Sequence, residues 1–117
     1  MSLQILHVAR AFSAQPTLGE CLSNATVIEA PLAEALASHC QPDLIWVSSA
    51  TPADVDAVRR RFPWARILAT PLRRASSEDI VRLIAGGADL VLEDGGVMLA
   101  AAALNALSRR QALAEVG

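Results

Sequence analysis

All ten basic residues of this 117-residue chain are arginines, so the sequence contains no lysine. It contains no tyrosine either. A phosphate-binding P-loop and a Schiff-base enzyme both need the amine of a lysine side chain. The absence of lysine therefore excludes both of these classes of site.

Charge is also scarce. Charged residues make up 19% of the chain, and the formal net charge is −2. Proteins that hold nucleic acid by its phosphate backbone carry a basic patch or stripe, and this sequence has none. We therefore expect no direct contact between this domain and nucleic acid.

Long hydrophobic runs are missing as well. The longest apolar stretch, residues 97–104, is far shorter than the roughly 20 residues that cross a bilayer. The first residues lack the basic start and the small-residue cleavage site of a signal peptide. We therefore expect a cytoplasmic protein without membrane contact.

Cysteine and histidine, the common protein ligands of transition metals, are few. Cys21 and Cys40 do not form a CxxC motif, and a cytoplasmic location favours reduced thiols over a disulfide. His7 and His39 have no third ligand at a recognisable spacing. We therefore expect no metal ion and no other cofactor.

Hydrophobic residues, by contrast, make up 53% of the chain, which is typical of a globular domain. Five short apolar runs, each about 13 to 25 residues from the next, predict five strands. These are residues 3–8, 25–29, 43–47, 66–69 and 89–92. The length predicts one domain spanning 1–117, with 113–117 as a frayed end or the start of a linker.

The segments between the runs mostly show helical periodicity. Helices are expected to begin near Pro16, at Thr51-Pro52 and at Ser76 or Ser77. The last of these three helices is expected to end at Gly86-Gly87. Two further helices are expected, at about 32–39 and 97–114. Three apolar helix faces are predicted. They are formed by Leu32, Ala35, Leu36 and His39, by Val55, Val58 and Phe62, and by Ile80, Leu83 and Ile84, the last of which is expected to be buried.

Alternating strands and helices indicate an α/β fold. We predict a three-layer sandwich, in which a five-stranded parallel sheet is covered by five helices in a doubly wound, flavodoxin-like arrangement. In such sheets a ligand or reaction site lies at the carboxyl ends of the strands. The residues at those ends are therefore the first candidates for function.

Three segments resemble the receiver domain of bacterial response regulators (CheY-like). They read PDLIWVSSA (42–50), ARILATP (65–71) and EDIVRLIAGGADLVLEDG (78–95). The turn Gly87-Ala88-Asp89 before the last strand is the most specific element. The resemblance covers essentially the whole chain and implies a signalling function in a two-component system.

The resemblance also implies where phosphoryl chemistry would take place. The acidic pair that holds Mg²⁺ falls on Ala9 and Arg10, and the phosphate-accepting aspartate falls on Ser48. The hydroxyl residue falls on Thr70, the lysine on Asp94 and the switch aromatic on Val91. Of these chemical positions, only the hydroxyl residue keeps its family type.

These replacements remove the chemistry of phosphotransfer. Mg²⁺ prefers carboxylate oxygens, which Ala9 and Arg10 do not supply. Serine forms no acyl phosphate, and Asp94 would repel the phosphoryl group that a lysine would neutralise. The chain therefore resembles an atypical receiver, or pseudo-receiver. An ion pair between Arg10 and Asp94 is a further hypothesis, the alternative being that both side chains are solvated.

Other polar residues have a simple structural interpretation beside a functional one. Asp89, Glu93 and Asp94 are expected to be solvated acids rather than a cation site. The arginine clusters 59–61 and 73–74 are expected to be solvated, with partner recognition as the alternative. Ser48 and Ser49 lack the GxSxG motif of a serine hydrolase. Trp46 is expected in the core, and Trp64 is expected to be partly exposed.

Because the catalytic groups are missing, we do not expect an enzyme. Function is then expected to depend on contacts made by the protein surface. The resemblance implies protein contact or dimerisation through the fourth helix, fifth strand and fifth helix. We expect a phosphorylation-independent signalling module acting on an attached or separate effector that is a transcription regulator. The alternative is a small-molecule sensor that uses the vacated pocket around Ala9, Ser48, Thr70 and Asp94. A second alternative is a small flavodoxin-like enzyme.

Overall fold

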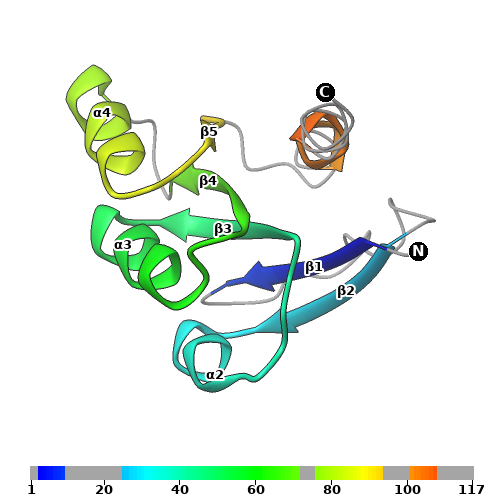
Figure 1. The fold of residues 1–117 in the computed structure, drawn as a ribbon. Helices are drawn as coiled ribbons and strands as arrows, with labels where there is room; N and C mark the ends of the chain where they lie inside the picture. Colours follow the sequence, from blue (N-terminus) through cyan, green and yellow to red (C-terminus); the bar gives the residue numbers. More distant parts are fainter. Residues whose placement is uncertain (1–2, 10–24, 72–75, 94–100, 108–117) are drawn as a thin grey trace.

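The computed structural model describes residues 3–9, 25–71, 76–93 and 101–107. Their strands form one parallel five-stranded sheet in the order β2-β1-β3-β4-β5 (Figure 1). This order is that of a flavodoxin-like, doubly wound sheet. The strands are β1 (Leu3–Val8), β2 (Ala25–Ala30), β3 (Leu44–Ala50), β4 (Arg66–Pro71) and β5 (Leu90–Val91).

The five predicted strands are confirmed. β1 has the predicted length, β2 is one residue longer, β3 and β4 are each two residues longer, and β5 is two residues shorter. β3 extends beyond the predicted end at residue 47, because Ser48 pairs with Thr70 and Ala50 with Pro71 around an irregularity in register. β5 is only two residues long, because it pairs with β4 at Leu90 and Val91 alone. The carboxyl end of β3 is therefore longer and more sharply bent than its apolar run suggested.

Helices cover both faces of the sheet. α2 (Leu32–Ala37), α3 (Pro52–Arg61) and α4 (Ser77–Ala85) lie on one side, and the helical segment 101–107 lies on the other (Figure 1). The predicted three-layer arrangement is thus confirmed with four helical segments among the described residues. The helix expected near Pro16 falls outside these residues.

Two helices begin with the side-chain caps that the sequence predicted. Thr51 Oγ1 accepts a hydrogen bond from the Asp54 backbone N–H at 3.2 Å, and the Asp54 carboxylate accepts one from the Thr51 N–H at 3.1 Å. Ser76 and Asp79 form the same reciprocal pair at the start of α4. Each capping box satisfies backbone donors that would otherwise lack partners, which fixes where these helices start.

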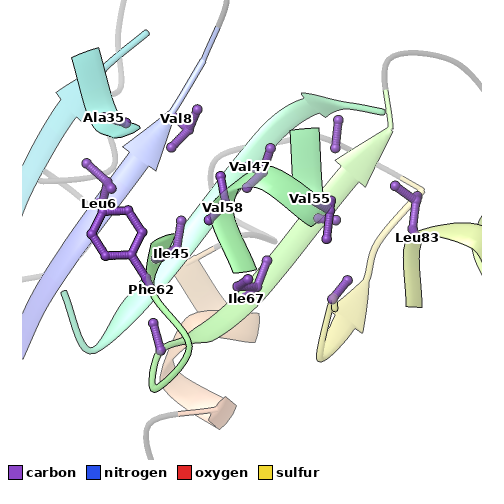
Figure 2. Close-up of a cluster of buried hydrophobic side chains, with 14 of the residues drawn as sticks. Leu6, Val8, Ala35, Ile45, Val47, Val55, Val58, Phe62, Ile67 and Leu83 are labelled. Atoms are coloured by element: carbon purple, nitrogen blue, oxygen red, sulfur yellow. The ribbon is translucent and has the colours of Figure 1, made fainter. Parts of the chain in front are cut away.

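Two hydrophobic clusters hold the layers together. The first fills the space between the sheet and helices α2, α3 and α4, with Phe62, Ile45 and Ile67 fully buried (Figure 2). The second lies on the opposite face, where the segment 101–107 packs on the sheet. Its buried members are Ile5, Leu44, Trp46, Leu68, Ala101, Leu104 and Leu107. Trp46 is therefore a core residue, as predicted.

Two predicted helix faces are wrong in part. Ile84 was expected to be buried in α4, yet 53% of its surface is exposed, whereas Leu83 is buried as predicted. The reason is that α4 packs against α3 and the short edge strand β5, so only a narrow stripe of the helix is covered. His39 is exposed because α2 already ends at Ala37. No helix in the described ranges has the length and apolarity that a bilayer span needs.

Candidate functional site

The predicted site residues gather at the carboxyl ends of the strands. Ser48 and Thr70 are direct register partners on β3 and β4. Ala9 follows β1, is buried, and donates its backbone N–H to the Ala30 carbonyl at 3.2 Å. Val91 ends β5 and packs against the core cluster on the side of α2 to α4. Arg10 and Asp94, and with them the proposed ion pair, lie outside the described residues.

The Ser48 hydroxyl has two partners within the protein. Its oxygen lies 3.1 Å from His7 Nε2 and 3.2 Å from the Val8 carbonyl oxygen. A serine hydroxyl has one hydrogen, and only a donor can bond to the carbonyl, so Ser48 donates to Val8 and accepts from the Nε2–H of His7. The side chain at the phosphoacceptor position is thus engaged by β1.

The imidazole of His7 is held in place by Trp46. The two rings are stacked, with centroids 4.0 Å apart and planes 6° from parallel. These residues are direct register partners on β1 and β3, which places both side chains on one face of the sheet. Burial lowers the pKa of His7 to about 4, so the imidazole is neutral at pH 7.

The Thr70 hydroxyl also has an internal partner. The Trp46 Nε1–H donates to Thr70 Oγ1 at 3.1 Å, and both residues are buried. Thr70 is the one polar residue in the buried class within the described part of the chain. A polar group in the core is tolerated when it is hydrogen-bonded, and the indole supplies that bond.

Sequence reasoning assigned His7 and Trp46 only general structural roles and missed their contacts with the site. The spacing of Trp46 and Ser48 in one strand does predict a shared face of the sheet. The position of His7 beside them depends on the register between β1 and β3, which no local pattern specifies.

Ser49 carries the strained backbone of the site. Its φ of 52° is left-handed, a conformation that costs a residue other than glycine about 1 kcal/mol. It lies at the break in register between Ser48 and Ala50, where β3 turns towards the cap of α3 at Thr51. The bend lets Ser48 pair with Thr70 and Ala50 with Pro71 before the chain enters α3.

The residues at this edge do not fit the Mg²⁺ ion that the receiver resemblance implies. Mg²⁺ requires oxygen ligands, and the buried side chain of Ala9 is a methyl group. The hydroxyl of Ser48 is already bonded to His7 and Val8. In the described ranges, no three His, Cys, Asp or Glu side chains are grouped to hold a metal ion.

The Gly87-Ala88-Asp89 turn lies at the opposite edge of the sheet and is bound tightly to α3. Gly87 has a φ of 122°, and a β-carbon there would lie 2.7 Å from Arg59 Cγ. Arg59 donates two hydrogen bonds to the Gly87 carbonyl, at 3.1 and 2.8 Å, and one to Asp89 at 2.8 Å. Glycine is needed here for the backbone conformation and for the close approach of the arginine.

Two of the clustered arginines are not the solvated charges that we predicted, and Asp89, although exposed as predicted, is also bonded within the protein. Asp89 also accepts the Ile67 backbone N–H at 2.8 Å and lies 3.5 Å from the Arg66 guanidinium. Arg61 donates to the Leu36 and Ser38 carbonyls. In the cluster 59–61, only Arg60 is largely exposed, with its side chain 79% accessible and paired with Asp56 at 3.2 Å. The cluster 73–74 lies outside the described residues.

The sheet order and the layers define a flavodoxin-like fold, the fold that the CheY-like receiver domains of response regulators adopt. No family model and no curated protein sequence matches the chain. Its relation to known proteins therefore rests on solved structures.

Three of these show the similarity. A response regulator from Thermotoga maritima is 14% identical with a TM-score of 0.74, and the match covers 90% of this chain and 96% of that one. The BeF3-activated DrrB receiver domain is 12% identical with a TM-score of 0.78, covering 93% and 99%. HP1043, an orphan response regulator of H. pylori, is 17% identical with a TM-score of 0.67, covering 90% and 95%. The predicted receiver fold is confirmed.

Proposed function

We propose that this chain is a phosphorylation-independent signalling module of the receiver type. It acts by protein contact on an attached or separate effector, a transcription regulator, in the cytoplasm of a bacterium. The observation that carries the proposal is the internal bonding of both hydroxyls at the carboxyl edge, Ser48 to His7 and Thr70 to Trp46. A receiver that works by phosphorylation needs these positions for the phosphoryl group.

The chemistry at the edge supports the same conclusion. The chain has no lysine to neutralise an incoming phosphoryl group. Ala9 provides no ligand for the metal that would otherwise do so. The fold of a receiver is thus combined with an edge that lacks the groups for phosphotransfer.

The exposed face of α4 is the proposed contact surface. Val81 is 63% exposed and Ile84 53% exposed, three residues apart on the helix. An ion pair between Glu78 and Arg82, 2.6 Å apart, lies on the same helix. Exposed apolar residues bordered by charged ones are typical of protein interfaces. We propose that this surface, together with β5 and the segment 101–107, contacts the partner or a second copy of the chain.

Light scattering of the purified chain, with and without acetyl phosphate and Mg²⁺, tests this function. We expect a dimer whose mass does not depend on the phosphate donor. Ile84→Glu should shift the mass towards the monomer. Ile28→Glu is the matched control, because Ile28 is an exposed isoleucine, at 42%, on the opposite edge strand β2.

Two results contradict the proposal. Association that appears only after treatment with acetyl phosphate shows that the chain is a phosphorylation-dependent receiver. Equal effects of Ile84→Glu and Ile28→Glu show that α4 is not the contact surface.

The small-molecule alternative has no support from the described residues, because the Ser48 and Thr70 hydroxyls already bond within the protein.

A further inference from the structure

The hydrogen bonds of Ser48 and Thr70 belong to one continuous line of side chains. His7 on β1 bonds to Ser48, its ring stacks on Trp46 of β3, and the indole bonds to Thr70 of β4. The line crosses three neighbouring strands on the face opposite α2, α3 and α4. It joins the carboxyl ends of these strands through side chains, in addition to the backbone ladder.

The part of the line between Trp46 and Thr70 is shielded from water. The exposed fractions of the two residues are 2% and 1%. Without solvent to take the place of either partner, breaking the bond leaves a buried donor and a buried acceptor unsatisfied. Thr70 is therefore fixed in one rotamer by the indole.

The end of β4 is also tied to α4. Thr70 precedes Pro71, the last residue of β4, and α4 begins at Ser77. On the other face of β4, Ile67 and Ala69 belong to the same buried cluster as Leu83 of α4. α4 packs mainly against α3 and β5, and β5 pairs with β4 at Leu68 and Ala69, so a change in the position of the β4 end reaches α4 through these two elements.

We propose that His7 and Trp46 form an aromatic latch that holds Thr70 and the end of β4 in one arrangement. By fixing β4, the latch holds α4 in a single position that presents Val81 and Ile84 to a partner. The hydroxyl that a phosphoryl group would engage in a typical receiver is engaged here by an indole N–H. This inference rests on the proposed function, because it explains how the chain controls the α4 contact surface that the proposed function requires.

Two substitutions at one position test the latch. Thr70→Val keeps the shape of the side chain and removes the hydroxyl, whereas Thr70→Ser keeps the hydroxyl and removes a methyl group. The chain has two tryptophans, so its NMR spectrum has two indole N–H signals, and Trp64→Phe assigns them. Amide hydrogen exchange of β4 and α4 is then measured in wild type and in both Thr70 variants.

We expect Thr70→Val to move the Trp46 indole signal and to speed exchange in β4 and α4 by about tenfold, while β2 changes by less than about twofold. Thr70→Ser should keep both the indole signal and the slow amide exchange of the wild type. Unchanged α4 exchange in Thr70→Val overturns the latch, and so does an equal increase in every strand, which reports only a loss of global stability. These readouts need no partner, so they are independent of the association experiment that tests the proposed function.

Discussion

The bonds of Arg59 make a strong prediction for the stability of the fold. Its guanidinium donates to the Gly87, Pro63 and Ala65 carbonyls and to the Asp89 carboxylate, and its side chain is 25% exposed. Each hydrogen bond contributes about 0.5–1.5 kcal/mol net, and bonds that share one group are not additive. We therefore expect Arg59→Met to lower the free energy of unfolding by about 2–4 kcal/mol.

Arg60→Met is the matched control for this prediction. Arg60 is the next residue of the same helix, and its exposed pair with Asp56 is worth only about 0.3–0.5 kcal/mol. Urea unfolding followed by circular dichroism measures both variants under the same conditions. If the two substitutions cost the same within about 0.5 kcal/mol, the Arg59 bonds do not stabilise the turn as argued.

The remaining predictions concern His7 and the glycine pair. The pKa of His7 is lowered to about 4 in the folded protein from 6.5, so the unfolded state binds more protons and stability falls as pH drops from 6.5 towards 4. Denaturant titrations should show that the free energy of unfolding is about 2 kcal/mol lower at pH 5 than at pH 7, and that His7→Gln removes this difference. An equal difference in the variant refutes the assignment of the pH dependence to His7. Gly87→Ala should cost about 1–3 kcal/mol because of its positive φ, whereas Gly86→Ala, at a helical φ of −73°, should cost less than about 1 kcal/mol. Thermal unfolding compares the two, and equal costs contradict the argument.

The sequence predicts the fold well where the signal is local. The apolar run of β3 and the capping residues Thr51 and Ser76 each determine a structure within a few residues of themselves. The burial of Ile84 in α4 was predicted wrongly, because helical periodicity does not show that a helix lies over the edge of a sheet. Local patterns therefore give the elements but not the extent to which each is covered.

The candidate site is predictable only in part. The resemblance placed Ser48 and Thr70 at adjacent strand ends, and the register of β3 and β4 confirms that they are neighbours. Their hydrogen-bond partners depend on side-chain contacts across strands, and His7 lies 41 residues from Ser48 in the chain. The same holds for Arg59, whose contact with Asp89 spans 30 residues.

Intact-mass measurement after incubation with acetyl phosphate and Mg²⁺ tests whether this receiver fold works without phosphorylation. We expect the unmodified mass of the chain under conditions in which an active receiver domain, treated in parallel, gains a phosphoryl group. A phosphoryl adduct on this chain that is lost in the Ser48→Ala variant would contradict it.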